Sequence, residues 1–480
     1  MWFFIALNEH KTKEMKLQIL PILLMLIGIY GIGQMPMKSM KMKADTTSQP
    51  KKKKPTHDMN GMQMDDMDMG GMDMGGGKMD MQNMSSPYSL NLPMSRSGSG
   101  TSWMPDESPM YMLMTQKGKT NFMFHGNLFA RYNSQDVFKK GSEGGSKFDA
   151  PNWFMGMLTH KLSDKDLLSA HLMMSLDPLL VGGNGYPLLF QSGESYKGQP
   201  LVNRQHPHDL FSELSVSYSH AFSKNVDAFV YFGYPGEPSI GPTAFMHRTA
   251  TMNNPDAPIG HHWQDATHIT FGVATFGLRW KKWMGEFSRF TGAEPDENRY
   301  NFDKMTFNSF SYRLSFAPSA NWSLQASRAH IKSPELLEPG VDVNRTTASA
   351  IYAKQWKEKD RHFTASLVWG MNEYKAEPTQ QSALLEANWQ VKKHAFYGRY
   401  EFVQKSGSEL GMTSVAGVVN VYNINAFTLG YNHTLSSTKH IELLAGTQAT
   451  LNFSPKALQN LYGKNPMAAE VYLQVRPRWM

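Results

Sequence analysis

From about Asn121 to the end of the chain, apolar and polar residues alternate in segments of roughly ten residues. In the segment 309–316, every second residue is Phe, Tyr or Leu, and the residues between them are Ser or Arg. Successive side chains of a strand point to opposite faces, so each segment predicts a strand with one apolar and one polar face. No segment of similar length has the period of a helix, and we therefore predict an all-β fold.

The connections between these segments alternate between short and long. The short ones lie near 162–165, 223–225, 281–282, 319–321, 358–361, 392–393 and 436–439, and the long ones near 134–151, 177–209, 235–265, 293–305, 332–344, 372–379, 404–422 and 454–467. This pattern is typical of a transmembrane antiparallel β-barrel with short periplasmic turns and longer outer loops. We predict about sixteen strands, within a range of twelve to eighteen, over residues 116–480.

Tryptophans support a membrane barrel over a soluble β-sandwich, which would show no aromatic belt. They stand near the ends of the predicted strands, where a belt at the membrane surface would place them. These residues are Trp153, Trp280, Trp283, Trp322, Trp356 and Trp389.

The first 33 residues have the pattern of a secretory signal. Lys16 precedes an apolar run from Leu17 to Tyr30, and small residues follow up to Gly33. Met15 opens a cleaner signal, so residues 1–14 read as an upstream mis-start. We predict export to the outer membrane of a Gram-negative bacterium; without cleavage the run would be an inner-membrane anchor. The sequence has no cysteine, which excludes thiolate metal sites and disulfides.

Residues 34–115 read as a disordered periplasmic tail rich in Met, Asp, Gly and Lys. Between Met35 and Met84 the sequence has fourteen methionines but no Leu, Ile, Val, Phe, Tyr or Trp. A core that uses methionine mixes it with other apolar residues, because methionine fills gaps. A segment with so little to bury is expected to remain unfolded.

The tail methionines offer thioether sulfur, a soft neutral ligand that suits Cu(I) and Ag(I) and needs no deprotonation. Glycines let separate Met-X-Met pairs approach one ion, and aspartates attract cations. We expect reversible binding of Cu(I) or Ag(I) and no tightly bound cofactor; the alternative is a low-complexity linker. The predicted ligands are His57, Met59, Met62, Met64, Met67, Met69, Met72, Met74, Met79, Met81 and Met84.

Two long outer loops are rich in histidine and form a second candidate metal site. Imidazole and carboxylate together suit Cu(II), Zn(II) or Ni(II), although the spacing here fits no single zinc motif. The competing interpretation is that these side chains hydrogen-bond the loops to the inner barrel wall. The candidates are His206, His208, Asp209, His247, His261, His262, Asp265 and His268.

Other residues allow weaker predictions. The segment 110–114, with three methionines among apolar neighbours, fits a plug or first strand as well as metal binding. Met155, Met157, Met173 and Met174 read as wall packing. No catalytic triad, phosphate loop or carboxylate pair stands out, so we expect no enzyme, and a net charge of +7 gives no indication of nucleic-acid binding.

Two resemblances follow from these residues. A Met/Asp/Gly tract before a barrel resembles the outer-membrane copper-resistance protein B family, which pairs a methionine-rich tail with a barrel. The motifs at 204–209 (RQHPHD), 245–248 (FMHR) and 261–271 (HHWQDATHITF) are similar to a largely uncharacterised group of bacterial outer-membrane proteins. The resemblances imply a barrel associated with metal resistance.

The expected function is copper or silver resistance. Its partners would be outer-membrane lipid, periplasmic metal ions and other metal-efflux components. The alternative is a general porin-like channel for small polar solutes, in which the tail is incidental.

A peptide covering residues 59–84 is predicted to bind Cu(I) or Ag(I) and to bind Zn(II) far more weakly, because thioether sulfur is a soft ligand. Replacing its methionines by leucine keeps the side-chain bulk, removes the sulfur and should abolish binding. Titration under reducing conditions measures both. Equal Cu(I) binding by the leucine peptide would remove this support for a metal-binding tail.

Overall fold

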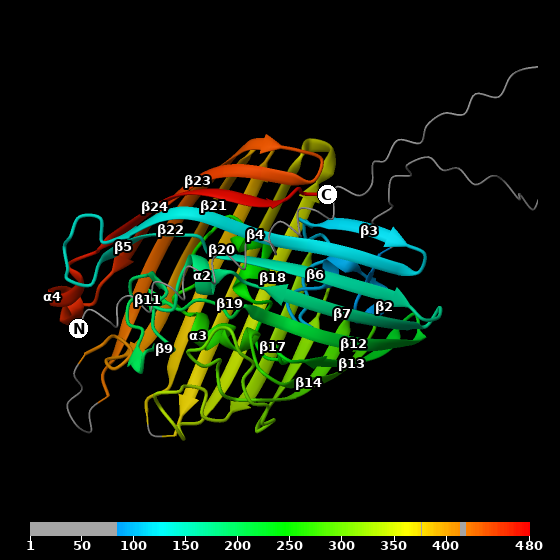
Figure 1. Cartoon of the computed structure of the whole chain (residues 1–480), viewed down its shortest axis with the longest axis horizontal. Coiled ribbons are helices and arrows are strands. Elements are labelled where there is room, and N and C mark those ends of the chain that lie inside the picture. The colour runs from blue at the N-terminus through cyan, green and yellow to red at the C-terminus, as the bar shows by residue number, and fades with distance from the viewer. Residues whose placement is uncertain (1–83, 376, 413–418) are drawn as a thin grey trace, which may run out of the picture. The chain divides into compact units, whose positions relative to one another are not determined.

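The computed structural model describes residues 84–375, 377–412 and 419–480, and these residues contain a closed antiparallel barrel (Figure 1). Its wall has sixteen long strands: three near the start, β4, β6 and β7, and the thirteen from β12 to β24. Pairing of β24 with β4 closes the ring, from Val475 beside Leu128 to Ala469 beside Ser134. The predicted barrel of about sixteen strands is confirmed.

The wall strands follow one another around the ring in chain order. They are β4 (Thr120–Gln135), β6 (Asn152–Lys161), β7 (Asp166–Met174), β12 (Phe211–Ser223), β13 (Val226–Gly233), β14 (Val273–Trp280), β15 (Trp283–Phe290), β16 (Ser309–Phe316), β17 (Trp322–Ile331), β18 (Val343–Trp356), β19 (Arg361–Tyr374), β20 (Gln380–Val391), β21 (His394–Ser406), β22 (Val421–Ser437), β23 (Ile441–Phe453) and β24 (Met467–Pro477). Two short strands, β3 (Leu113–Lys117) and β5 (Gly145–Asp149), each pair with part of one edge of β4.

The remaining elements are short and lie in the connections and in the N-terminal segment. The strands are β1 (Ser85–Ser86), β2 (Ser89–Pro93), β8 (Tyr186–Pro187), β9 (Ser195–Tyr196), β10 (Gln199–Pro200) and β11 (Arg204–Gln205). The helices and helical turns are η2 (Met94–Arg96), α2 (Asp177–Leu180), η3 (Phe245–His247), η4 (Thr249–Thr251), α3 (His261–Gln264), η5 (Ala266–His268), η6 (Lys357–Lys359), η7 (Lys456–Leu458) and α4 (Gln459–Tyr462).

The alternating sequence pattern sorts the wall residues by face. In β16, Ser311 and Arg313 point inward and are buried, whereas Tyr312 and Leu314 point outward and are each 51% exposed. The polar and charged wall residues Asn127, Arg131, Glu213, Glu386, Arg399 and Glu401 are all buried. The wall is therefore polar within and apolar without, as a lipid-facing barrel requires.

Large apolar side chains cover the outer surface on most wall strands, with Val230, Leu367 and Leu429 more than half exposed. A surface of this kind is far more apolar than that of a soluble monomer. Five tryptophans project outward near the strand ends: Trp280, Trp283, Trp322, Trp356 and Trp389.

Trp153 was also predicted for the aromatic belt, and that prediction is wrong. It is 7% exposed and points into the lumen, because its position in β6 has inward parity. Among the described helices, none is both long and apolar enough to cross a membrane.

The predicted alternation of connections also agrees with the strand bounds. Two residues join β14 to β15 and β20 to β21, whereas 39 residues (234–272) join β13 to β14. All the short turns therefore lie at one end of the barrel and the long loops at the other, because each pair of neighbouring strands is antiparallel.

Residues 84–115 differ from the prediction. The sequence placed them in the disordered tail, but residues 84–112 are folded and only Asn91 among them is exposed, while 113–115 begin β3. The segment 84–112 contacts the short-turn end of the wall: the amide of Glu107 donates to the carbonyl of Ala320, and Ser323 donates to that of Trp103. Polar side chains of the inner wall supply partners that the tail composition could not reveal. The signal and the tail up to residue 83 lie outside the described residues.

Two deletions should separate the tail from the folded segment. Removing 35–83 should leave the heat resistance of the barrel unchanged. Removing 84–112 should lower the temperature at which the compact band converts to the slower unfolded band on gels, because it uncovers buried polar groups of the wall. It should also raise the conductance in planar bilayers. Equal behaviour of the two deletions would contradict a structural role for 84–112.

Candidate functional site

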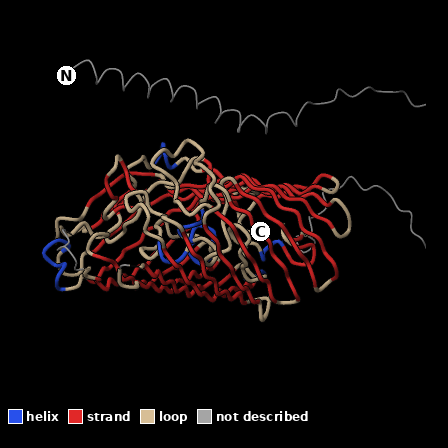
Figure 2. The backbone as a smooth tube through the Cα atoms, turned by 90° about the horizontal axis from the view of Figure 1, so that it is seen from below, coloured by secondary structure: helices blue, strands red, loops and turns tan. Residues whose placement is uncertain are grey.

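The connection between β13 and β14 fills part of the lumen. From Pro235 to Gly272 every residue is buried except the half-buried His247 and His268. The segment contains the four helical turns η3, η4, α3 and η5. Figure 2 shows loop and helical segments within the ring of strands. This long loop therefore folds into the barrel.

The N-terminal segment and this loop contact each other inside the barrel. The amide of Ala244 donates to Ser99 Oγ over 2.7 Å, and the hydroxyls of Ser102 and Thr243 are 2.8 Å apart. Gly98 permits the approach, because a Cβ at this position would lie 2.2 Å from Thr243 Oγ1. We call residues 84–112 and 234–272 together the plug.

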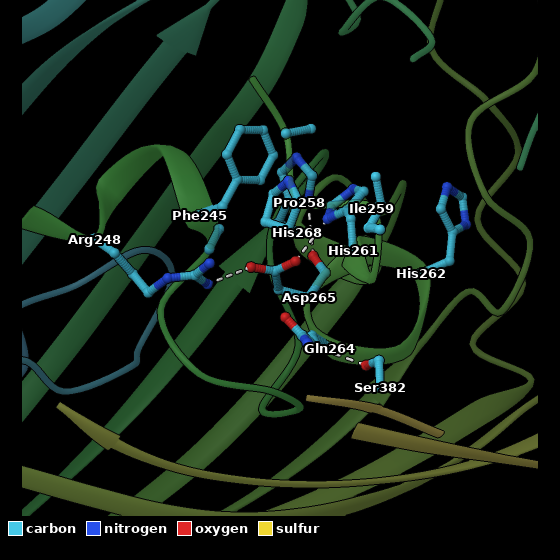
Figure 3. A network of polar contacts seen from close by, with 12 residues as sticks. Phe245, Arg248, Pro258, Ile259, His261, His262, Gln264, Asp265, His268 and Ser382 are labelled. Carbon is cyan, nitrogen blue, oxygen red and sulfur yellow. Dashed lines mark hydrogen bonds and ion pairs between the residues drawn. The ribbon is translucent and has the colours of Figure 1, made fainter. Parts of the chain in front are cut away.

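A buried guanidinium anchors the loop to the wall. Arg248 Nη1 lies 2.6 Å from Asp265 Oδ2 (Figure 3), and its Nε lies 2.5 Å from Glu386 Oε1 on β20. Arg399 on β21 is 3.3 Å from the other oxygen of Glu386. Two cations thus face two carboxylates in a region that excludes water. Such a cluster is costly to disrupt, because removing one member leaves a buried charge unpaired.

A second buried guanidinium, on the wall, also joins the loop to the wall. Arg131 on β4 contacts Asp149 Oδ1 at 2.7 Å, Asp256 Oδ1 at 2.6 Å and Glu470 Oε2 at 2.9 Å. Asp256 belongs to the plug, and the other two acids belong to the wall. The loop is therefore fixed to the wall by charge at two places and not by apolar packing alone.

Five of the six predicted loop histidines gather in one cluster. The ring centroid of His261 lies 5.1 Å from His268, 5.3 Å from His262 and 6.2 Å from His206, and that of His208 lies 5.5 Å from His268. Their sequence positions span 63 residues, and the fold of the loop over β11 and the strands beside it brings them together.

Carboxylates and carbonyls hold one nitrogen of most of these rings. His261 Nδ1 lies 2.6 Å from Asp265 Oδ1, His208 Nδ1 lies 2.9 Å from Asp177 Oδ2, and His206 Nε2 lies 3.1 Å from Glu194 Oε1. His268 Nδ1 donates to the carbonyl of Asp265 over 2.8 Å. Among the described atoms, the buried Nε2 nitrogens of His208, His261, His262 and His268 have no hydrogen-bond partner.

Burial decides the charge of these groups. It lowers the pKa of His206 and His262 well below the ordinary value, and that of His268 to about 3. These rings are therefore neutral at physiological pH. Burial alone would raise the pKa of the Asp265 carboxyl, but Arg248 and His261 lower it well below its usual range. Asp265 remains ionised and orients both neighbours.

The structure treats the predicted metal ligands unequally. Asp209 pairs with Arg299 at 3.2 Å, apart from the ring cluster, and His247 lies beside His125 and Trp153 instead. In the described part of the chain, no three or more His, Asp or Glu side chains are arranged to hold a metal ion. Metal binding by the outer loops stays a prediction, and the hydrogen bonds above fit the competing anchoring role.

Met84 is the only predicted tail ligand among the described residues. It is buried, and its carbonyl accepts a hydrogen bond from the amide of Met94 over 2.9 Å. The other tail ligands, His57 and the methionines from Met59 to Met81, lie outside the described residues.

Sequence reasoning missed the charged anchors. Arg131 and Glu386 lie on wall strands, and their loop partners Asp256 and Arg248 lie 125 and 138 residues away along the chain. No local pattern links residues at such separations. The one available signal was the presence of isolated charges at inward parity in strands that are otherwise lined with Ser, Thr and Asn.

Comparisons with known proteins give only distant structural likenesses. No protein-family model matches the sequence, and no curated protein does. Solved structures to which this chain is similar include an anion-selective porin from Comamonas acidovorans (12% identity, TM-score 0.45, covering 75% of this chain and 99% of that one). Others are OmpF of Salmonella typhi in complex with daunomycin (10%, 0.46, 76% and 100%) and OprB of Pseudomonas putida at high pH (8%, 0.44, 74% and 94%).

Glu237 at the junction of the plug should make stability depend on pH. It accepts a hydrogen bond from Ser99 over 3.1 Å, and burial raises its pKa to about 8 from an ordinary value of 4.5. A carboxyl whose pKa is raised by folding stabilises the fold at pH values below its ordinary pKa of 4.5. This contribution is lost as the pH rises through about 8.

The variant Glu237→Gln stays neutral at every pH and should remove this loss. The gel conversion temperature of the wild type should fall towards alkaline pH, and that of the variant should fall less. The exposed Glu358→Gln on η6 is the matched control and should follow the wild type. Parallel curves for Glu237→Gln and the wild type would contradict a protonated Glu237.

Proposed function

We propose that this protein is an outer-membrane barrel of a Gram-negative bacterium that handles Cu(I) or Ag(I) in metal resistance. A closed barrel wall with an apolar outer surface supports the membrane location, because such a surface is stable only against lipid or a partner. The metal assignment rests on the methionine-rich tail, because the thioether of methionine is a ligand that prefers soft ions.

The position at which the tail joins the barrel supports a periplasmic role for it. Asn91 donates to the carbonyl of Ser223 over 3.1 Å, and Ser89 donates to Asp227, so this segment enters beside the short turn between β12 and β13. Short turns of bacterial barrels face the periplasm. The tail would therefore sample periplasmic ions and deliver them to, or retain them at, the inner mouth of the barrel.

A general porin-like channel for small polar solutes is the second candidate. The inward-facing Ser, Thr and Asn side chains of the wall favour it, since a polar lining suits an aqueous path. A plug anchored by Arg131 and Arg248 disfavours it, because an open channel needs free cross-section. A plugged barrel suits a substrate that is small and specifically ligated.

Growth of a deletion strain in copper or silver tests the proposal. The strain should grow less well than the wild type at raised Cu or Ag, and the full chain should restore growth. A tail-leucine chain, with the thirteen methionines from Met35 to Met81 replaced by leucine, should restore growth only partly. Raised Zn(II) is the control and should not separate the strains. Growth unaffected by Cu and Ag but reduced on small polar nutrients would favour the channel.

A further inference from the structure

A cavity of about 80 Å³ lies between the plug and strands β4 and β6, and methionine dominates its lining. The N-terminal segment contributes Met94, Met104, Met110 and Met112. Strand β6 contributes Met155 and Met157, and the loop contributes Met252. Its described lining contains no Leu, Ile, Val or Phe, which repeats within the fold the contrast seen in the tail.

Gap-filling alone does not account for this lining. A methionine that fills a gap sits among other apolar residues, and empty apolar cavities in proteins are lined by Leu, Ile and Phe. Here seven methionines from three separate parts of the chain converge on one space. The rest of the lining consists of three serines, one threonine, two glycines, two histidines, Pro109, Tyr111 and Trp153.

The two histidines make the cavity a coordination environment. The ring centroids of His125 on β4 and His247 on the plug are 5.6 Å apart, and Trp153 lies 4.5 Å from His247. His125 Nε2 is buried and has no hydrogen-bond partner among the described residues. An unpaired buried nitrogen costs free energy unless a ligand satisfies it.

We propose that this cavity binds one soft monovalent cation, Cu(I) or Ag(I), through thioether sulfur and imidazole nitrogen. The described lining contains no carboxylate and no Lys or Arg, so it has neither the oxygen ligands that hard divalent ions prefer nor a cation that would repel the ion. One water needs roughly 10–15 Å³, so the space admits an ion. The inference deepens the proposed function, on which it rests for the class of ion, but it concerns the barrel and not the tail.

Metal titration of the purified full chain in detergent tests the site. The tail-leucine chain is the background, so that tail sulfur does not contribute, and Ag(I) alone or Cu(I) with a competing chromophoric chelator is the probe. We expect one equivalent to bind. The variant Met155→Leu with Met157→Leu should fold, since swaps that conserve volume are tolerated in packed cores. It should bind the ion at least tenfold more weakly, because it lacks two of the sulfur ligands. His247→Gln should weaken it similarly.

The matched control is Met123→Leu with Met173→Leu. Both residues are buried in the same methionine-rich cluster but do not line the cavity, so this pair should bind like the background. The heat-dependent gel shift verifies that each variant is folded. X-ray absorption of the loaded background chain should show sulfur neighbours of the ion, and these should decrease in the Met155/Met157 variant.

Two results would overturn the inference. A folded tail-leucine chain that binds no Ag(I) or Cu(I) would show that the barrel has no such site. Equal binding by the Met155/Met157 variant and its control would place the ion elsewhere. Neither result affects the growth test, which uses the native tail, so the cavity site can be disproved while the proposed function stands. Conversely, a deletion strain that grows like the wild type at raised Cu or Ag would contradict the proposed function, even if the tail-leucine chain binds the ion.

Discussion

Closure of the ring between β4 and β24 is the constraint on which the rest of the structure depends. In lipid, an unpaired backbone amide or carbonyl costs several kcal/mol, so the strands must leave no free edge. Closure forces each wall residue either towards lipid or into the lumen, because successive side chains alternate. The lumen of sixteen strands is then too wide for wall side chains alone to fill, and polar inward residues need partners. The plug provides them.

Charge pairing fixes the plug in this polar interior. Arg131 and Arg248 each join one loop carboxylate to acids of the wall, and Arg313 on β16 joins Glu286 to Thr101 of the N-terminal segment. Loss of one partner from such a buried pair costs about 3–5 kcal/mol. The two plug segments are thereby held from different sides of the barrel. They meet where Ser99 and Ser102 contact the loop, so the position of one limits the position of the other.

The barrel could be predicted from sequence because its signal is local. Alternation within 309–316 requires only that neighbouring residues face opposite sides, and the turn lengths specify which ends meet. The plug could not be predicted in the same way. Residues 84–112 are rich in Ser and Met, and their folding depends on partners such as Asp227, Ala320 and Ser323, which lie far along the chain. Trp153 is buried because it occupies an inward-facing position in the alternation of β6. Its place near the end of a strand does not reveal which face it occupies.

The candidate site shows the same division. Sequence spacing identified the loop histidines as a group, and five of them do cluster. The acids that contact His208 and His206, Asp177 and Glu194, lie earlier in the same connection, at spacings that match no motif. Met155 and Met157 read as wall packing because period-two alternation fits either role. Only the arrival of Met110, Met112 and Met252 from elsewhere in the chain gives them a shared cavity. Convergence of distant segments is tertiary information that no local window contains.

The distribution of charge inside the barrel favours a soft cation over a hard one. Asp149, Asp256 and Glu470 are committed to Arg131, and Asp265 and Glu386 to Arg248. At either of these clusters, a hard divalent ion would have to displace a guanidinium to obtain the carboxylates as ligands, and would leave that guanidinium buried and unpaired. The methionines of the cavity, with His125 and His247, take no part in these ion pairs. The proposed soft ion would therefore bind without disturbing the anchors, so the proposed site is compatible with the pairs that hold the plug in place.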